Sequence, residues 1–223
     1  MASINSHFTF NYSQPTEYRL SHDSVFLARE IFERLSAIDL SGKRGLDICA
    51  GSGIVGMDFL FHRRAAGQSL PSYFDFLEVQ EIYSGHFALN CSRLGPIGTH
   101  LNFLCCNYEK LAAAAYTDVF DLIVCNPPYF LPGQGKPSPS EFKNRCRFFI
   151  DSNLQRLLAG VYHCMKPDGV CFMTLRELAE HGLDILAEAR NFSENKLQIE
   201  EAGLIRGTHL LRLTKLKKAR DGL

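Results

Sequence analysis

The stretch Asp47-Ile-Cys-Ala-Gly51-Ser-Gly53-Ile-Val-Gly56 is the part of the sequence that decides the fold. It continues a short apolar run, residues 45–49, that predicts a buried strand, and a helical pattern follows the glycines. Glycine at such a turn lets the backbone approach a ligand that a Cβ atom would block. We therefore expect a strand, a turn with a ligand against it, and a helix. A tight turn without a ligand is the alternative.

Strand and helix patterns alternate through the rest of the chain. Apolar runs predict strands at 45–49, 73–78, 100–106, 119–125, 170–175, 198–201 and 210–213. Helical spacing of apolar residues predicts helices at 24–38, 54–66, 81–94, 108–115, 149–165 and 176–190. Strands separated by helices indicate a doubly wound α/β fold, with a mostly parallel sheet covered on both faces. We expect one domain over residues 1–223.

Length and composition exclude several classes of protein. The chain has 223 residues, of which 46% are hydrophobic and 22% charged, as in ordinary globular proteins. Its 24 basic residues balance 24 acidic ones, which argues against a protein coated in positive charge for non-specific nucleic-acid binding. No uncharged apolar run approaches the ~18 residues of a membrane span, and the first residues do not resemble a signal peptide. We expect a cytoplasmic protein that contacts no membrane.

The cysteines predict neither disulfides nor a metal site. The chain has eight cysteines and eight histidines, but no Cys-x-x-Cys pair and no companion histidine spacing for a metal. Several cysteines lie inside apolar runs, where a reduced cysteine packs as a small hydrophobic side chain. Without an export signal, we expect all of them to be free thiols.

Polar residues stand directly after the predicted strands, where ligands bind in a sheet of this kind. Glu78 closes the second strand, 22 residues beyond Gly56, which is where the acid of a dinucleotide-binding pattern belongs. A carboxylate there can accept hydrogen bonds from both hydroxyls of a ribose. Asn107 and Tyr108 follow the third strand and are suited to reading an adenine edge and stacking on the ring. Asn107 is equally suited to a simple turn.

The tetrapeptide Asn126-Pro127-Pro128-Tyr129 follows the fourth strand. Two successive prolines make a rigid loop that offers carbonyl acceptors without competing N–H donors. Asn126 adds a side-chain carbonyl, and Tyr129 adds a flat face. Such a loop is suited to holding a planar –NH2 group by its two hydrogens, with the nitrogen directed at an electrophile. A turn that only ends the strand would explain the prolines, but not the asparagine and tyrosine together.

On the glycine turn and this tetrapeptide, the chain resembles class I S-adenosylmethionine-dependent methyltransferases whose Asn-Pro-Pro-Tyr motif methylates a planar amine or amide nitrogen. The resemblance implies a Rossmann-like, mostly parallel seven-stranded sheet with an antiparallel C-terminal strand, and S-adenosyl-L-methionine as the cofactor. It implies catalytic roles for Asn126, Pro127 and Tyr129. The cofactor-binding residues that it implies are Asp23, Asp47, Cys49, Gly51, Gly53, Glu78, Asn107, Tyr108 and Asn126. Cys49 stands where the family has its first glycine, and Asn107 where it usually has aspartate.

Within that superfamily, the chain is most similar to bacterial tRNA methyltransferases that act on the exocyclic amine of an adenine near the anticodon. The similarity rests on residues 18–27 and on Glu141-Phe-Lys-Asn-Arg145. It implies tRNA as the partner, and an N-terminal segment and helix, residues 1–44, that cover the cofactor site. The alternatives are a release-factor glutamine amide, a guanine amine in ribosomal RNA, or DNA as substrate. A nicotinamide-dependent oxidoreductase and a non-catalytic RNA-binding subunit are alternatives from other classes.

The segment 126–148 shows no convincing helix or strand pattern, and a loop this long is uncommon unless it is functional or disordered. Its second half carries a net charge of +3, from four basic residues against Glu141: Lys136, Lys143, Arg145 and Arg147. Positive charge beside the tetrapeptide suits the phosphates that flank an unpaired base. We therefore expect Lys143, Arg145 and Arg147 to contact a structured RNA. The basic tail 215–220 is either a solvated end or a second RNA contact.

Overall fold

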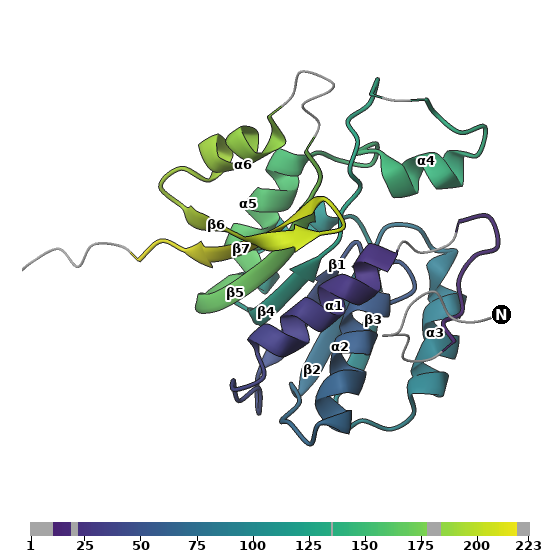
Figure 1. Cartoon of the computed structure of the whole chain (residues 1–223), viewed down its shortest axis with the longest axis vertical. Coiled ribbons are helices and arrows are strands. Elements are labelled where there is room, and N and C mark those ends of the chain that lie inside the picture. The colour runs from purple at the N-terminus through teal and green to yellow at the C-terminus, as the bar shows by residue number, and fades with distance from the viewer. Residues whose placement is uncertain (1–10, 19–21, 135, 178–183, 218–223) are drawn as a thin grey trace, which may run out of the picture.

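The structure is a computed structural model that describes residues 11–18, 22–134, 136–177 and 184–217. Its helices are α1 (His22–Arg34), α2 (Ile54–Ala65), α3 (Tyr83–Leu94), α4 (Glu141–Arg147), α5 (Leu154–Cys164) and α6 (Ile185–Ser193), with the 3-10 turns η1 (Tyr108–Ala112) and η2 (Ala114–Tyr116). Its strands are β1 (Arg44–Ile48), β2 (Tyr73–Glu78), β3 (His100–Cys105), β4 (Phe120–Cys125), β5 (Met165–Leu175), β6 (Leu197–Ile205) and β7 (Thr208–Lys215). Strands and helices alternate along most of the chain (Figure 1).

The strands form one seven-stranded sheet in the order β3-β2-β1-β4-β5-β7-β6. Strands β1 to β5 pair in parallel, and β7 pairs antiparallel with both β5 and β6. The strand order reverses between β1 and β4, so the carboxyl ends of these two strands flank the switch point where ligands bind in such sheets. The predicted fold class is confirmed: the sheet is Rossmann-like and mostly parallel, with an antiparallel C-terminal strand.

Helices cover both faces of the sheet. The sequence of β4 shows why, because its side chains are apolar on both faces. Leu122 and Val124 belong to the core layer packed against α1, α2 and α3, whereas Ile123 and Cys125 belong to the layer packed against α5 and α6. All four side chains are buried. Because side chains alternate across a strand, a strand covered on both faces needs an unbroken apolar run. In Figure 1, α1 and α2 lie in front of the sheet.

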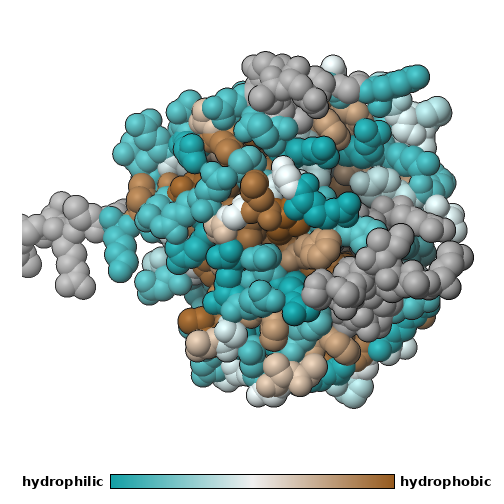
Figure 2. Space-filling model, in the orientation of Figure 1, coloured by the Kyte–Doolittle hydropathy of each residue, from teal (hydrophilic) through white to brown (hydrophobic). Residues whose placement is uncertain are grey.

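One face of the molecule is mostly polar. Figure 2 shows hydrophilic side chains over most of one face, with apolar side chains gathered near its middle. No helix in the described ranges has the length and apolarity to cross a membrane. Those same ranges contain no group of three or more His, Cys, Asp or Glu side chains that could hold a metal, and all eight cysteines are free thiols.

Several element boundaries differ from the sequence predictions. The segment 126–148, expected to lack an element, contains α4, whose first turn is capped by Ser140 Oγ accepting from the Lys143 N–H at 3.3 Å. Residues 108–115, predicted as a helix, form two 3-10 turns, because Ala113 between them has an extended backbone, with φ −72° and ψ 147°, that interrupts a helix. The helix predicted from residue 149 begins at 154, where the Asn153 side chain caps it.

Element boundaries in the last third of the chain also differ from the sequence predictions. Strand β5 begins at Met165 and not at residue 170, with an irregular register against β4 between Phe120 and Leu122. Strands β6 and β7 extend beyond the predicted 198–201 and 210–213. Of the helix predicted over 176–190, residues 178–183 lie outside the described residues, and α6 accounts for its second half.

Candidate active site

A cavity of about 400 Å³ lies at the carboxyl ends of the strands around the switch point. Most of the predicted site residues line it, namely Asp23, Cys49, Gly51, Glu78, Asn107, Tyr108, Asn126, Pro127, Tyr129, Arg145 and Arg147. Gln14, Tyr18 and Ser24 join Asp23 on the wall, so the N-terminal segment and the start of α1 border the cavity. Three predicted site residues do not line it: Asp47, Gly53 and Lys143.

The turn after β1 has a left-handed backbone at three positions. The angle φ is 58° at Cys49, 53° at Gly51 and 85° at Gly53. A non-glycine residue in this conformation costs roughly 1–2 kcal/mol, which explains why a glycine suits the position of Cys49. A Cβ atom on Gly53 would lie 2.9 Å from side-chain atoms of both Met57 and Phe87. Gly53 thus allows the turn to pack on α2 and α3, and it does not face the cavity.

Asp47 lies beneath this turn, where we expected it to contact the cofactor. It is fully buried, and its Oδ2 accepts a hydrogen bond from the Gly56 N–H at 2.9 Å. Burial raises the pKa of Asp47 to about 8, and the charge of Glu78 adds to the rise. Because no part of its carboxyl group reaches the cavity wall, Asp47 is better described as a residue that ties α2 to β1.

Glu78 closes β2 and lines the cavity, as its position at a strand end predicted. Its two carboxylate oxygens accept hydrogen bonds from the N–H groups of Gly51 and Gln80, each at 2.9 Å. Burial raises the pKa of Glu78, and these backbone hydrogen bonds oppose the rise. A carboxylate has about four acceptor positions, so the fixed group keeps acceptors for two hydroxyls.

Asn107 and Tyr108 line the cavity at the end of β3, but both are engaged within the protein. Asn107 Oδ1 accepts from the Glu109 N–H at 2.9 Å, and Asn107 Nδ2 donates to the Asp151 carbonyl at 2.8 Å. The Tyr108 hydroxyl donates to the Asn153 carbonyl at 3.2 Å. The Asn107 amide therefore caps η1, as the simple-turn alternative anticipated. Reading an adenine edge with this amide would require one of its hydrogen bonds to open.

Three hydroxyl groups from different parts of the fold hold the Asn126 amide. Asn126 Nδ2 donates to Ser24 Oγ at 2.9 Å. Asn126 Oδ1 accepts from the Tyr129 hydroxyl at 2.8 Å and from Thr174 Oγ1 at 2.7 Å. Burial raises the pKa of Tyr129 to about 12, so its phenol is neutral and can donate at ordinary pH. The amide plane is thereby fixed between α1, the tetrapeptide loop and β5.

The returning chain holds the backbone of the tetrapeptide loop. The N–H groups of Tyr129 and Phe130 both donate to the Arg147 carbonyl, at 3.1 and 2.9 Å, and the Phe149 N–H donates to the Phe130 carbonyl at 2.8 Å. Pro127 has no N–H and contributes a carbonyl acceptor only. The intervening segment, which includes α4, thus begins and ends beside the tetrapeptide.

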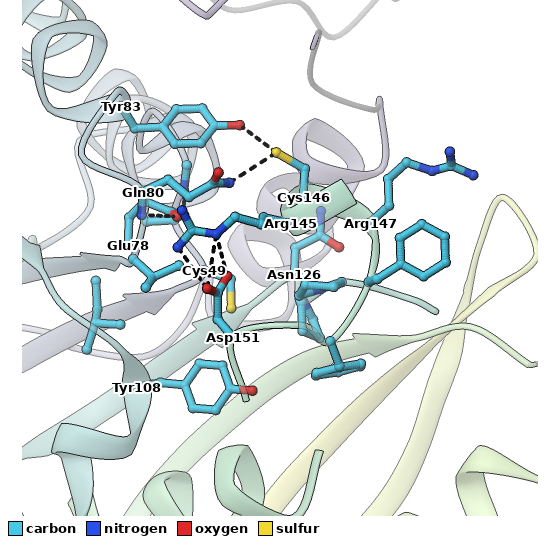
Figure 3. A pocket seen from close by; sticks show the side chains of 18 of the residues that line it. Cys49, Glu78, Gln80, Tyr83, Tyr108, Asn126, Arg145, Cys146, Arg147 and Asp151 are labelled. Carbon is cyan, nitrogen blue, oxygen red and sulfur yellow. Dashed lines mark hydrogen bonds and ion pairs between the residues drawn. The ribbon is translucent and has the colours of Figure 1, made fainter. Parts of the chain in front are cut away.

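Arg145 extends from α4 into the cavity (Figure 3). Its guanidinium donates to both carboxylate oxygens of Asp151, with Nη2 2.8 Å from Oδ1. Figure 3 shows this guanidinium beside Glu78, so it lies between two acidic groups of the cavity wall. We predicted an RNA contact for Arg145, but its charge is already paired with a carboxylate inside the cavity.

The rest of α4 is held against the same wall. The Cys146 thiol lies 3.3 Å from both the Gln80 Nε2 donor and the Tyr83 hydroxyl. Burial raises the pKa of Cys146, so the thiol is neutral at ordinary pH. The ring of Phe142 packs 5.7 Å from Tyr83 and 6.4 Å from Tyr18, measured between ring centroids. Helix α4 therefore forms a cover that spans from the cavity wall to the N-terminal segment.

Arg147 differs from Arg145 in its surroundings. Its guanidinium carbon lies 5.5 Å from the ring centroid of Phe130 and 5.4 Å from that of Phe148. Figure 3 shows Arg147 pointing away from Glu78 and Asp151. Aromatic faces stabilise a cation without neutralising it, so Arg147 keeps its positive charge for an outside partner.

Sequence reasoning missed the groups that position the site. Ser24 and Thr174 hold the Asn126 amide, and Asp151 pairs with Arg145. A signal for Thr174 was present, because it is a polar residue in an otherwise apolar strand end. The pairing of Asp151 depends on how α4 folds over the cavity, and nothing in the local sequence pattern indicates it.

Comparison with solved structures identifies the fold. The chain matches precorrin-6y C5,15-methyltransferase from Geobacter metallireducens with a TM-score of 0.57 at 13% identity, over 92% of this chain and 94% of that one. It matches ribosomal protein L11 methylase from Lactobacillus delbrueckii with a TM-score of 0.56 at 18% identity, over 88% and 80%. A 16S rRNA methyltransferase from T. thermophilus gives 0.61 at 15% identity, over 90% and 45%. The fold is the class I methyltransferase fold.

Sequence comparison adds more specific relatives. No protein-family model matches the chain. It is 26% identical over 152 residues to a tRNA1(Val) (adenine(37)-N6)-methyltransferase from a Shewanella species, covering 67% of this chain and 60% of that protein. It is 26% identical over 129 residues to the protein of the same name from Bacteroides fragilis, covering 58% and 50%. The matched part thus spans only 50–60% of the length of these relatives.

Proposed function

We propose that the protein is an S-adenosylmethionine-dependent methyltransferase that acts on the exocyclic amine of an adenine in RNA, and that tRNA is the RNA class. The observation that carries the proposal is the Asn126 amide, held by three hydroxyls in the same cavity as the buried Glu78 carboxylate. One cavity thus offers a ribose acceptor and an amine acceptor. The distant similarity to tRNA adenine methyltransferases supports the choice of adenine.

The donor half of the cavity comprises Glu78 and the glycine turn. We assign the two ribose hydroxyls to the Glu78 carboxylate, whose orientation is set by the N–H groups of Gly51 and Gln80. Gly51, with φ 53°, lines the cavity at the turn, and we assign the methionyl part to the space beside it. Asp23 and the N-terminal segment border this half and are suited to closing over it. When bound there, the cofactor supplies an electrophilic methyl group on a sulfonium.

The acceptor half comprises the tetrapeptide loop. Asn126 Oδ1 and the Pro127 carbonyl accept the two hydrogens of the target amine, and the Tyr129 ring stacks on the base. These contacts would leave the nitrogen lone pair directed at the methyl group that the cofactor would supply. Positive charge would develop on the nitrogen, so both acceptor bonds would strengthen toward the transition state, and the surplus proton would pass to solvent.

Arg147 and Arg176 are the RNA contacts that we favour. Arg147 keeps its charge between two aromatic rings, and Arg176 is exposed directly after β5 at the edge of the same cavity. Lys143, on α4 but off the cavity wall, is a further candidate. Arg145 is instead reassigned to the cavity wall, because Asp151 already neutralises it. A few local charges suit recognition of a structured RNA by a protein whose net charge is zero.

A planar glutamine amide is the second candidate substrate, because its –NH2 group would fit the same acceptors. The experiment that separates the candidates uses the labelled methyl donor with separate pools of tRNA, ribosomal RNA and a release factor. We expect label in tRNA, recovered after digestion as a methylated adenosine. Label only in the release factor would replace the proposal with the glutamine alternative, and label in a guanosine of ribosomal RNA would replace adenine with guanine.

A further inference from the structure

The acceptor oxygen of Asn126 is already fully used in the structure. A carbonyl oxygen has two lone pairs, and Asn126 Oδ1 accepts from both the Tyr129 hydroxyl and Thr174 Oγ1. The target amine of the proposed reaction needs one of these two positions. Methyl transfer at this site therefore requires one hydroxyl to leave the oxygen when the substrate arrives.

The surroundings of the two hydroxyls decide which one leaves. Thr174 is fully buried on β5, where it is paired with Leu210 of β7, so a hydroxyl that left Asn126 would stay buried and out of reach of water, at a cost in free energy. Tyr129 is half-buried on the tetrapeptide loop, and it lines the cavity that a base would enter. Its backbone is held by Arg147, and its hydroxyl has a second hydroxyl, that of Thr208, within reach besides Asn126 and Thr174.

We infer that the Tyr129 hydroxyl occupies the amine-binding position of Asn126 in the free protein, and that the target amine displaces it. Thr174 is the positioning residue that keeps the amide plane in place throughout, with Ser24 holding the opposite end. The inference rests on the proposed function only in needing a planar –NH2 substrate. Displacement of the hydroxyl also frees the Tyr129 ring to stack on the base that enters.

The exchange predicts an unusual effect for removing one hydroxyl. Tyr129→Phe keeps the ring and removes the competing donor, so the KM for the nucleic acid should fall and kcat/KM should rise. The change should be about 2- to 12-fold, which is the range for one neutral hydrogen bond. Tyr129→Ala is the matched control, because it removes the ring as well and should lower kcat/KM.

The positioning role of Thr174 predicts that kcat and KM respond differently from each other. Thr174→Val keeps the side-chain shape and removes the hydroxyl, so kcat should fall while KM changes little. Thr174→Ser restores the hydroxyl and should restore most of kcat. Calorimetric titration of the Thr174→Val variant with S-adenosylmethionine should give the wild-type affinity, which also shows that the variant is folded.

The outcomes separate this inference from the proposed function. If the wild-type protein methylates RNA but Tyr129→Phe lowers kcat/KM, the hydroxyl is an ordinary contact and the inference is wrong. If Thr174→Val keeps the wild-type kcat, or Thr174→Ser fails to restore it, the positioning role is wrong. If RNA takes no label but a glutamine amide does, the proposed function is wrong, and the same variants test the inference on that amide. If no planar –NH2 substrate is methylated, both are wrong.

Discussion

The donor half and the acceptor half of the cavity are built in different ways. Glu78 is held by N–H groups of the adjacent turns, those of Gly51 and Gln80. Asn126 is held by side chains that are remote in sequence: Ser24 is 102 positions away and Thr174 is 48 positions away. The donor half thus depends on backbone groups at the ends of the neighbouring strands β1 and β2, whereas the acceptor half depends on how the side chains of α1, β4 and β5 pack together. Substitutions should separate cofactor binding from methyl transfer.

The largest effect should come from the centre of the acceptor half. Asn126→Ala removes an acceptor that strengthens in the transition state, so turnover should fall by roughly 10²-fold or more, by analogy with the loss of one oxyanion-hole donor. Steady-state methylation of tRNA measures the fall, and titration calorimetry should show unchanged cofactor affinity. The control is Asn102→Ala, at an exposed position outside the cavity, which should keep wild-type turnover. Near-normal turnover of Asn126→Ala would remove Asn126 from catalysis.

The next effect should come from the donor half. Glu78→Ala should weaken binding of S-adenosylmethionine by about 1.5–3 kcal/mol, the usual loss for hydrogen bonds to a charged group. Because burial raises the pKa of Glu78, and the ionised form is the better acceptor, cofactor affinity of the wild type should increase as pH rises through that pKa. Calorimetry at several pH values measures both effects. An unchanged dissociation constant in the variant would refute the ribose assignment.

A third prediction concerns Asp47 beneath the donor half. Its pKa is about 8 in the folded protein and about 3.9 in an unfolded chain, so folding favours the protonated form. Its contribution to stability is therefore fully present below pH ~4 and is lost as pH rises toward 8. Asp47→Asn should flatten this part of the pH dependence of the free energy of unfolding, measured by urea denaturation. If both proteins show the same slope between pH 5 and 8, Asp47 ionises normally.

The smallest effect should distinguish the two arginines of α4. Arg147→Ala should raise the KM for tRNA, and reduce the slope of log K against log salt by about 1, as the loss of one phosphate contact does. Arg145→Ala should leave that slope unchanged and alter cofactor affinity, since its guanidinium lies in the cavity against Asp151. Salt-dependent RNA binding of the two variants tests this. Equal slopes for both variants would mean that neither or both contact phosphate.

The sequence predicted the site residues whose place depends only on the order of strands and helices along the chain. Glu78 and Asn126 were found because each directly follows an apolar strand, and parallel strands bring such ends together. The sequence did not predict which way the side chains of Asp47 and Arg145 point, because that direction depends on the elements that pack against each residue. Ser24 and Thr174 were missed for a related reason, since their hydroxyls act on a residue of another element.

Helix α4 illustrates a further limit of the local pattern. Its seven residues, Glu141–Arg147, are too few to show a helical repeat of apolar residues, and none of them is buried. What stabilises it is the Ser140 cap and contacts with the cavity wall, such as those of Cys146 with Gln80 and Tyr83. Only the Ser140 cap could have been predicted from neighbouring residues in the sequence.

The separation of the two halves is tested most directly by single-turnover methyl transfer to tRNA at increasing S-adenosylmethionine, with Glu78→Ala and Asn126→Ala measured side by side. We expect the rate of Glu78→Ala to approach the wild-type rate as the cofactor saturates. We expect the rate of Asn126→Ala to stay roughly 10²-fold lower at every concentration. If saturating cofactor restores Asn126→Ala, or fails to restore Glu78→Ala, the cavity does not divide into a donor half and an acceptor half.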